Sequence, residues 1–174
     1  MLNKIVMLLI SSCIIISCSA IKPAPDPEFY RYSVAYKYIV KHNQNLRKAR
    51  VRTIDSLEAT QLLDFYLEIA RDWKLKERNI VDKLDSIDKS APNPVYKPWL
   101  KRLTNSPSKP PKFVVSFSKT FNNYFTAEVL SVISPKYNSA NAQRPVFGRS
   151  TIYLFAFGKN NEIIKVYSYE LAYN

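Results

Sequence analysis

The spacing of apolar residues changes along this chain, from a mainly helical period to a strand period. Before residue 91, apolar side chains recur every three or four positions, as on one face of a helix. After residue 112 they alternate with polar side chains, as in a strand with one buried face. Helices followed by strands predict an α+β fold, with N-terminal helices packed on an antiparallel meander sheet of four to five strands.

Three segments carry the helical spacing, and one segment between them alternates weakly. The apolar residues of the first helix are largely aromatic, and the polar run "HNQN" is expected to end it. The predicted helices cover residues 28–45, 59–76 and 78–90, and the short strand covers 49–57.

A proline-rich segment, 91–111, separates the helices from the strands. It contains six of the 11 prolines and predicts a linker, in which Trp99 and Leu100 anchor the chain on the core. Neither side of this linker has the apolar residues of a self-sufficient core. Residues 28–174 are therefore expected to form a single domain.

The sequence "TFNNY" lies between two alternating segments and predicts a hairpin. A two-residue loop would put the two apolar sets on opposite faces of the sheet. A three-residue loop, 121–123, pairs Phe117 with Ala127 and leaves a single apolar face. Because the buried face decides the register, we predict the three-residue loop, with Asn123 in the left-handed region.

The N-terminus has the pattern of a secretory signal. Lys4 is followed by an apolar stretch over residues 5–16, which is interrupted by two serines. These 12 residues are too few for a membrane-spanning helix, which needs about 20. The chain then becomes polar and proline-rich at once, so a cleaved segment is expected.

The sequence "IISC" at residues 15–18 resembles a bacterial lipobox. The resemblance implies that the Cys18 thiol is acylated and that a peptidase cuts before it. Residues 1–17 would then be a lipoprotein signal peptide, and 18–27 a lipidated cysteine with a proline-rich tether. Cys13 ends a second, less suitable match, and the N-terminal pattern also allows an ordinary cleaved signal or an uncleaved anchor. With Cys18 acylated, the mature domain has no free thiol.

The strand half of the chain resembles the closing meander of small uncharacterised lipoproteins of the Bacteroidota. This resemblance implies no activity and no functional residues. Ser19, rather than Asp, follows the acylated cysteine, which implies sorting to the outer membrane. Surface exposure of such lipoproteins is associated with acidic residues close behind the cysteine. The first acidic residue here is Asp26, eight positions after Cys18. We therefore expect an outer-membrane lipoprotein whose domain faces the periplasm.

Basic charge is concentrated in the strand half. Residues 18–90 have a net charge of +3 and residues 91–174 have a net charge of +8. Besides the lipid that holds the anchor, the expected partner is a protein or an acidic envelope polymer. No nucleic acid partner is expected for an exported lipoprotein, and charge that serves only solubility is the alternative. The oligomeric state is not predicted.

A polar loop of fifteen residues, 134–148, joins strands that need only a short turn. Loops of this length in small domains are usually functional or disordered. Tyr137 and Arg144 in the loop, with Arg149 just after it, supply aromatic and basic groups for contacts. These three residues are the predicted binding site.

The residues that common enzymes need are scarce, so we predict no enzyme, no cofactor and no metal site. There are two glycines, too few for a phosphate-binding loop, and one histidine, His42, which is expected on the surface at a helix end. The triplet Asp82, Asp85 and Asp88 predicts a solvated helix face. Glu128 and Glu170 lie on strands and are the remaining candidates for an acid/base pair.

We therefore interpret the chain as a non-enzymatic envelope lipoprotein that binds its partner through the basic strand half. One alternative is a small-molecule or glycan-binding domain, in which Tyr153, Phe155 and Phe157 of the predicted strand 149–157 line a pocket. Another is an immunity lipoprotein against a secreted toxin. A final strand is expected at 162–173.

Overall fold

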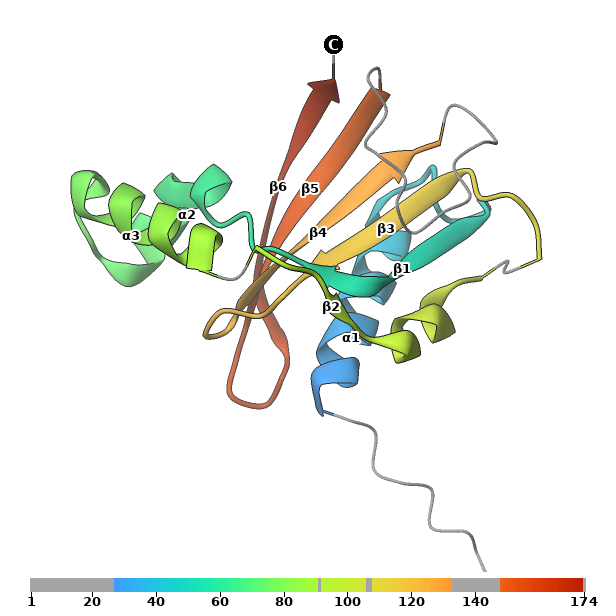
Figure 1. Cartoon of the computed structure of the whole chain (residues 1–174), viewed down its shortest axis with the longest axis horizontal. Helices are drawn as coiled ribbons and strands as arrows, with labels where there is room; N and C mark the ends of the chain where they lie inside the picture. The colour runs from blue at the N-terminus through green and yellow to red at the C-terminus, as the bar shows by residue number, and fades with distance from the viewer. Residues whose placement is uncertain (1–26, 91, 106–107, 133–147, 174) are drawn as a thin grey trace, which may run out of the picture.

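The computed structural model describes residues 27–90, 92–105, 108–132 and 148–173. They form a six-stranded mixed sheet with helices on both faces (Figure 1). The predicted α+β class is correct. The spatial order of the strands is β2 (Val95–Tyr96), β1 (Val51–Glu58), β3 (Phe113–Ser118), β4 (Tyr124–Ser131), β5 (Gly148–Phe157) and β6 (Ile163–Tyr173).

Of the helices that the structure describes, one precedes β1, and the others lie in the segment that connects β1 to β3. Among the described helices, none is both long and apolar enough to cross a membrane. The α-helices are α1 (Pro27–His42), α2 (Tyr66–Trp73) and α3 (Glu77–Ser90), and the 3-10 helices are η2 (Leu63–Phe65) and η3 (Pro98–Leu103).

The predicted antiparallel meander is correct only for the second half of the chain. Strands β3 to β6 follow one another with antiparallel pairing, but β1 lies parallel to β3. The short strand β2 pairs antiparallel with β1 at the edge, so the sheet has six strands rather than four or five. Parallel neighbours need a long connection, and η2, α2, α3, β2 and η3 supply it.

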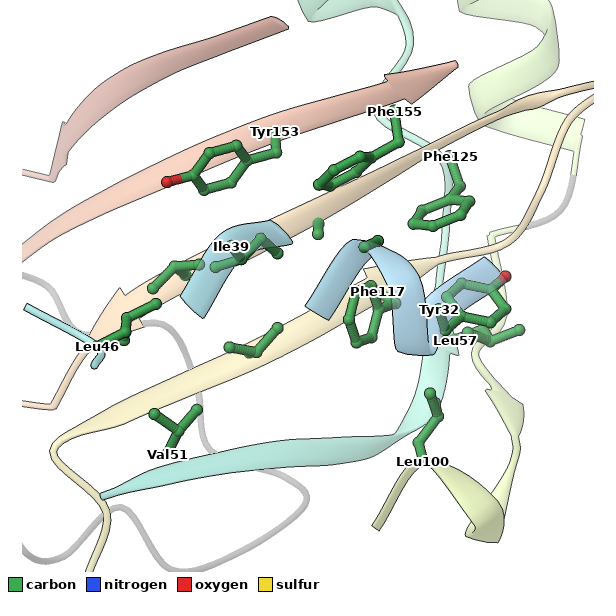
Figure 2. Close-up of a cluster of buried hydrophobic side chains, with 14 of the residues drawn as sticks. Tyr32, Ile39, Leu46, Val51, Leu57, Leu100, Phe117, Phe125, Tyr153 and Phe155 are labelled. Atoms are coloured by element: carbon green, nitrogen blue, oxygen red, sulfur yellow. The ribbon is translucent and has the colours of Figure 1, made fainter. Parts of the chain in front are cut away.

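Alternation along the strands divides the sheet into two apolar faces. One face carries Val115, Phe117 and Phe125 and is covered by α1 (Figure 2). The opposite face carries Ile152 and Leu154 and is covered by α2 and α3. The N-terminal helices do pack on the sheet, as predicted, but they cover both faces of it.

Tyr32 of α1 lies at the centre of the first core. Its side chain is fully buried, and its ring centroid lies 4.6 Å from that of Phe125 and 5.3 Å from that of Phe117. The hydroxyl donates to the Ser118 carbonyl at 3.1 Å, so the buried polar atom is satisfied. Trp99 packs against Tyr32 from the linker at a centroid distance of 5.7 Å, and the neighbouring Leu100 is fully buried, which confirms both predicted anchors.

The predicted helix 59–76 is shorter in the structure, whereas 28–45 and 78–90 are confirmed as α1 and α3 within three residues. The Asp88 carboxylate of α3 accepts hydrogen bonds from the backbone N–H groups of Leu62 and Leu63 at 3.0 and 2.9 Å. These contacts fix the start of η2, which occupies residues 63–65, and α2 begins after it at Tyr66.

The hairpin between β3 and β4 has the predicted register but a different turn. Phe117 pairs with Ala127 as expected. The turn, however, is a two-residue one closed by reciprocal Phe121–Tyr124 hydrogen bonds of 2.8 and 2.9 Å. Asn122 has the positive φ, 53°, so the prediction for Asn123 is wrong.

Between the Phe117–Ala127 pair and the two-residue turn, the β3 side of the hairpin has one residue more than the β4 side. Opposite β4, the backbone N–H of Thr126 donates to the Ser118 side-chain oxygen at 2.8 Å instead of to a backbone carbonyl. This side-chain contact interrupts the ladder between Ser118 and Phe121. The apolar register and the short turn are therefore both possible.

Substitutions at the two turn asparagines should have different effects. Asn122→Gly is expected to be neutral or mildly stabilising, because glycine has no steric penalty at positive φ. Asn122→Val should lower the free energy of unfolding by about 1 kcal/mol or more. Asn123→Val is the matched control and should cost less, and urea unfolding measures all three. Equal losses for the two valine variants would contradict the assignment of Asn122.

Candidate functional site

Basic side chains gather at one end of the sheet, where β1 and β3 begin and β5 begins beside the end of β4. In Figure 1, the starts of β1 and β3 and the end of β4 lie at the upper right. We call this cluster the basic end. Apart from Arg52, which is half-buried, its side chains are exposed. Its members are Arg47, Lys48, Arg50, Arg52, Lys109, Lys112 and Arg149.

Backbone contacts bring the members of the basic end together from distant parts of the chain. The Lys112 N–H donates to the Arg50 carbonyl at 2.8 Å, and the Arg50 Nε donates to the Pro110 carbonyl at 2.8 Å. On the far side of β4, the Ser131 hydroxyl donates to the Arg149 carbonyl at 3.4 Å. Because neighbouring strands lie about 4.8 Å apart, Arg50 and Arg149 are separated by roughly 15 Å across the sheet.

The turn between α1 and β1 is fixed by packing, so its cations have a defined place. Leu46 is fully buried in the first core. Arg47 donates through Nε and Nη2 to the Lys41 carbonyl at 3.1 and 2.8 Å, which satisfies a free carbonyl at the end of α1. A cation is also favourable at this negative end of the helix dipole.

Among the described residues, no carboxylate forms an ion pair with a side chain of the basic end. In the described part of the chain, the ion pairs join Lys89 to Asp85, Lys97 to Glu28, Lys101 to Asp55 and Lys165 to Asp72. None of these pairs includes a residue of the basic end. Seven cations on one end of the domain therefore present a strongly positive surface.

The predicted binding site is only partly described by the structure. Arg149 begins β5, is exposed and belongs to the basic end. Tyr137 and Arg144 lie outside the described residues, as do the rest of the loop before Gly148 and Cys18. The structure thus tests neither their proximity to Arg149 nor the acylation.

Sequence reasoning missed most of the basic end because it divided charge between two halves of the chain. The dense basic run at residues 47–52 lies in the half with the smaller net charge, +3. Parallel pairing of β1 with β3 then places this run beside Lys112 of the other half. The signal that could have found the site is the run "LRKARVR" itself, directly before a strand.

The proposed aromatic pocket is wrong for the three residues named. Tyr153, Phe155 and Phe157 are 8, 0 and 1 % exposed and belong to the core beneath α1. Figure 2 shows the Tyr153 and Phe155 rings directed toward the helix. Because β5 lies between two strands and under helices on both faces, its aromatic side chains fill the interior instead of lining a binding site.

The predicted carboxylate pair is also not formed. Glu128 of β4 lies opposite Ile152, whereas Glu170 of β6 lies opposite Thr151. Residues 151 and 152 are consecutive on β5 and face opposite sides of the sheet. The two carboxylates therefore lie on different faces and cannot act on one substrate.

The other polar residues singled out in the sequence have local roles. His42 is exposed at the end of α1, where its ring stacks on that of Tyr38 at a centroid distance of 3.9 Å. Asp82 is exposed on α3, Asp85 pairs with Lys89 at 2.7 Å, and Asp88 caps η2. Within the described residues, no three metal-ligating side chains of the His, Cys, Asp or Glu types come together.

Asp72 of α2 is the centre of a partly buried polar cluster on the second face. Its side chain is only 7 % exposed and forms an ion pair with Lys165 of β6. The Tyr124 and Tyr167 hydroxyls each donate to it at 3.2 Å. These three partners come from β4 and β6, so Asp72 fastens α2 to the sheet and its acceptor oxygens are already in use.

Removal of the Asp72 carboxylate should be far more costly than removal of an exposed one. Asp72→Ala leaves two tyrosine hydroxyls without their acceptor and is expected to lower the free energy of unfolding by about 2 kcal/mol or more. Asp85→Ala, which breaks an exposed pair on α3, should change it by less than about 0.5 kcal/mol. Urea unfolding compares the two variants, and similar losses would argue against the fastening role of Asp72.

The same cluster should make the fold sensitive to alkaline pH. Burial, aided by the Asp72 carboxylate, raises the pKa of Tyr124 to about 12. Since tyrosine in the unfolded chain loses its proton near pH 10, stability should be complete below that pH and fall as the pH rises toward 12. Tyr124→Phe should lose less stability over this interval, as measured by urea unfolding at both ends of it. Identical losses for the two proteins would contradict this assignment.

No protein-family model, curated protein or solved structure that was compared with the chain matches it. The site must therefore be interpreted from its chemistry. The basic end has four arginines and three lysines, which donate hydrogen bonds to carboxylate and phosphate oxygens but supply no nucleophile at neutral pH. Such a surface can bind anions.

Proposed function

We propose that this chain is a cell-envelope lipoprotein anchored by an acylated Cys18, and that its domain is a non-enzymatic binding module. The lipobox at residues 15–18 supports the anchor. The start of the folded domain is compatible with this anchor, because α1 begins at Pro27, nine residues after Cys18. The observation that carries the binding role is the basic end, a positive surface without acidic partners among the described residues.

The start of α1, which is the described segment nearest in sequence to the proposed anchor, and the proposed binding surface lie at opposite ends of the domain. In Figure 1, α1 begins at the bottom, while β1 and β3 begin at the upper right. Tyr32, near the start of α1, contacts Ser118 at the end of β3, and Arg47 follows the other end of the helix. A protein held at its N-terminus would therefore present the basic end away from its point of attachment.

The location that we propose is the outer membrane, with the domain in the periplasm. Ser19 and the distance of Asp26 from Cys18 support this sorting. The binding module would then act on a partner within the periplasmic space. An acylated cysteine with two or three chains gives stable anchoring, whereas a single chain does not.

Cys18→Ala should abolish both acyl labelling and membrane association of the protein in the producing cell, because the lipid is attached to this thiol. Cys13→Ala is the matched control, since that residue would leave with the signal, and it should retain both. Labelling with a clickable fatty acid measures acylation, and separation of inner and outer membranes measures location. Retention of Cys18→Ala in the membrane, without label, would refute the lipid anchor.

A further inference from the structure

We infer that the basic end binds an acidic polymer of the cell envelope, a flexible chain with repeated carboxylates or phosphates. This partner deepens the proposed function and rests on it for the cellular setting. The alternative ligand of a tethered basic domain is the anionic headgroups of the membrane that holds it. The geometry of the domain argues against those headgroups.

The length of α1 separates the basic end from the side of the anchor. The helix has 16 residues, so it extends about 24 Å at 1.5 Å per residue. The screening length at physiological salt is about 8 Å. Even with Pro27 placed at the bilayer surface, the far end of an upright α1 lies about three screening lengths away, where attraction to headgroups is weak.

The arrangement of the cations favours a ligand with many charges over a single small anion. Arg50 and Lys112 directly precede the neighbouring strands β1 and β3, and Arg149 lies on β5, two strands beyond β3. Their positions span roughly 15 Å across the strands, farther than one carboxylate or phosphate can reach. Each exposed contact is weak alone. A polymer can make several of them at once, because after the first contact the others form within one complex and not by separate binding events.

The described contacts leave these cations available for a ligand. Lys48, Lys109 and Lys112 are exposed, and none of them has a side-chain hydrogen bond or an ion pair to another described residue. Arg50 uses Nε for the Pro110 carbonyl, which leaves its terminal nitrogens for an anion. Both residue types therefore offer donors that face solvent.

The test measures binding of fluorescent poly-L-glutamate and of polyphosphate to the full chain in a neutral detergent, by anisotropy at low and physiological salt. The double variant Lys48→Glu/Lys112→Glu should weaken binding of both polymers at least tenfold. Lys76→Glu/Lys159→Glu makes the same change in net charge at exposed positions outside the basic end and should weaken it less than threefold. The free amino acid glutamate should not compete at equivalent carboxylate concentration.

Several results would overturn the inference. These are equal weakening by the two double variants, absence of polymer binding by the natural chain, or tighter binding to phosphatidylglycerol vesicles or duplex DNA than to either polymer. Far-UV circular dichroism and thermal melting establish that each variant is folded, and Lys48→Gln/Lys112→Gln should show an intermediate loss. Binding in solution does not require acylation, so loss of the lipid anchor and loss of polymer binding are separate outcomes.

Discussion

The double-sided burial of β5 is the constraint on which the arrangement of the domain depends. Its residues 152–157 are all buried, with Phe155 against α1 on one face and Leu154 against the α2–α3 pair on the other. A strand with two apolar faces is stable only when both are covered. The long segment between β1 and β3 therefore does two things: it brings α2 and α3 to the second face and returns the chain for a parallel pairing.

This use of the aromatic residues determines where binding can occur. Tyr32, Phe117 and Phe125 contact one another in the interior, and Tyr32 also satisfies its hydroxyl there. Their rings are buried in the core, and this burial contributes a large share of the stability of a domain of this size. The charged side chains at the strand ends are mostly exposed and are not needed for this packing. In the described part of the chain, the faces of the sheet are covered by packing, whereas the ends of the sheet can present recognition groups.

Local pattern predicted the elements that local forces determine. The alternation around Phe117 gave the register with Ala127, and the helical spacing around Tyr32 gave α1. The parallel pairing of β1 had no local signal, because its partner lies beyond two helices in the sequence. Positive φ at Asn122 was missed because a side-chain contact within the hairpin, from the Thr126 N–H to the Ser118 hydroxyl, accommodates the extra residue before the turn. The basic end was missed for the same reason as β1, since Arg50 and Lys112 become neighbours only in the folded sheet.

The proposed anchor and the basic end would together make weak contacts sufficient for binding. Cations on neighbouring strands repel one another, and acids elsewhere in the domain, such as Asp55, are paired with other lysines rather than with them. A polyanion bound as proposed would relieve this repulsion, and several individually weak contacts would together stabilise the complex. A lipid anchor would restrict the domain to a layer near the membrane and raise its effective concentration toward a polymer in that layer. Under these conditions modest affinity suffices, and a deep pocket is not required for the domain to remain bound.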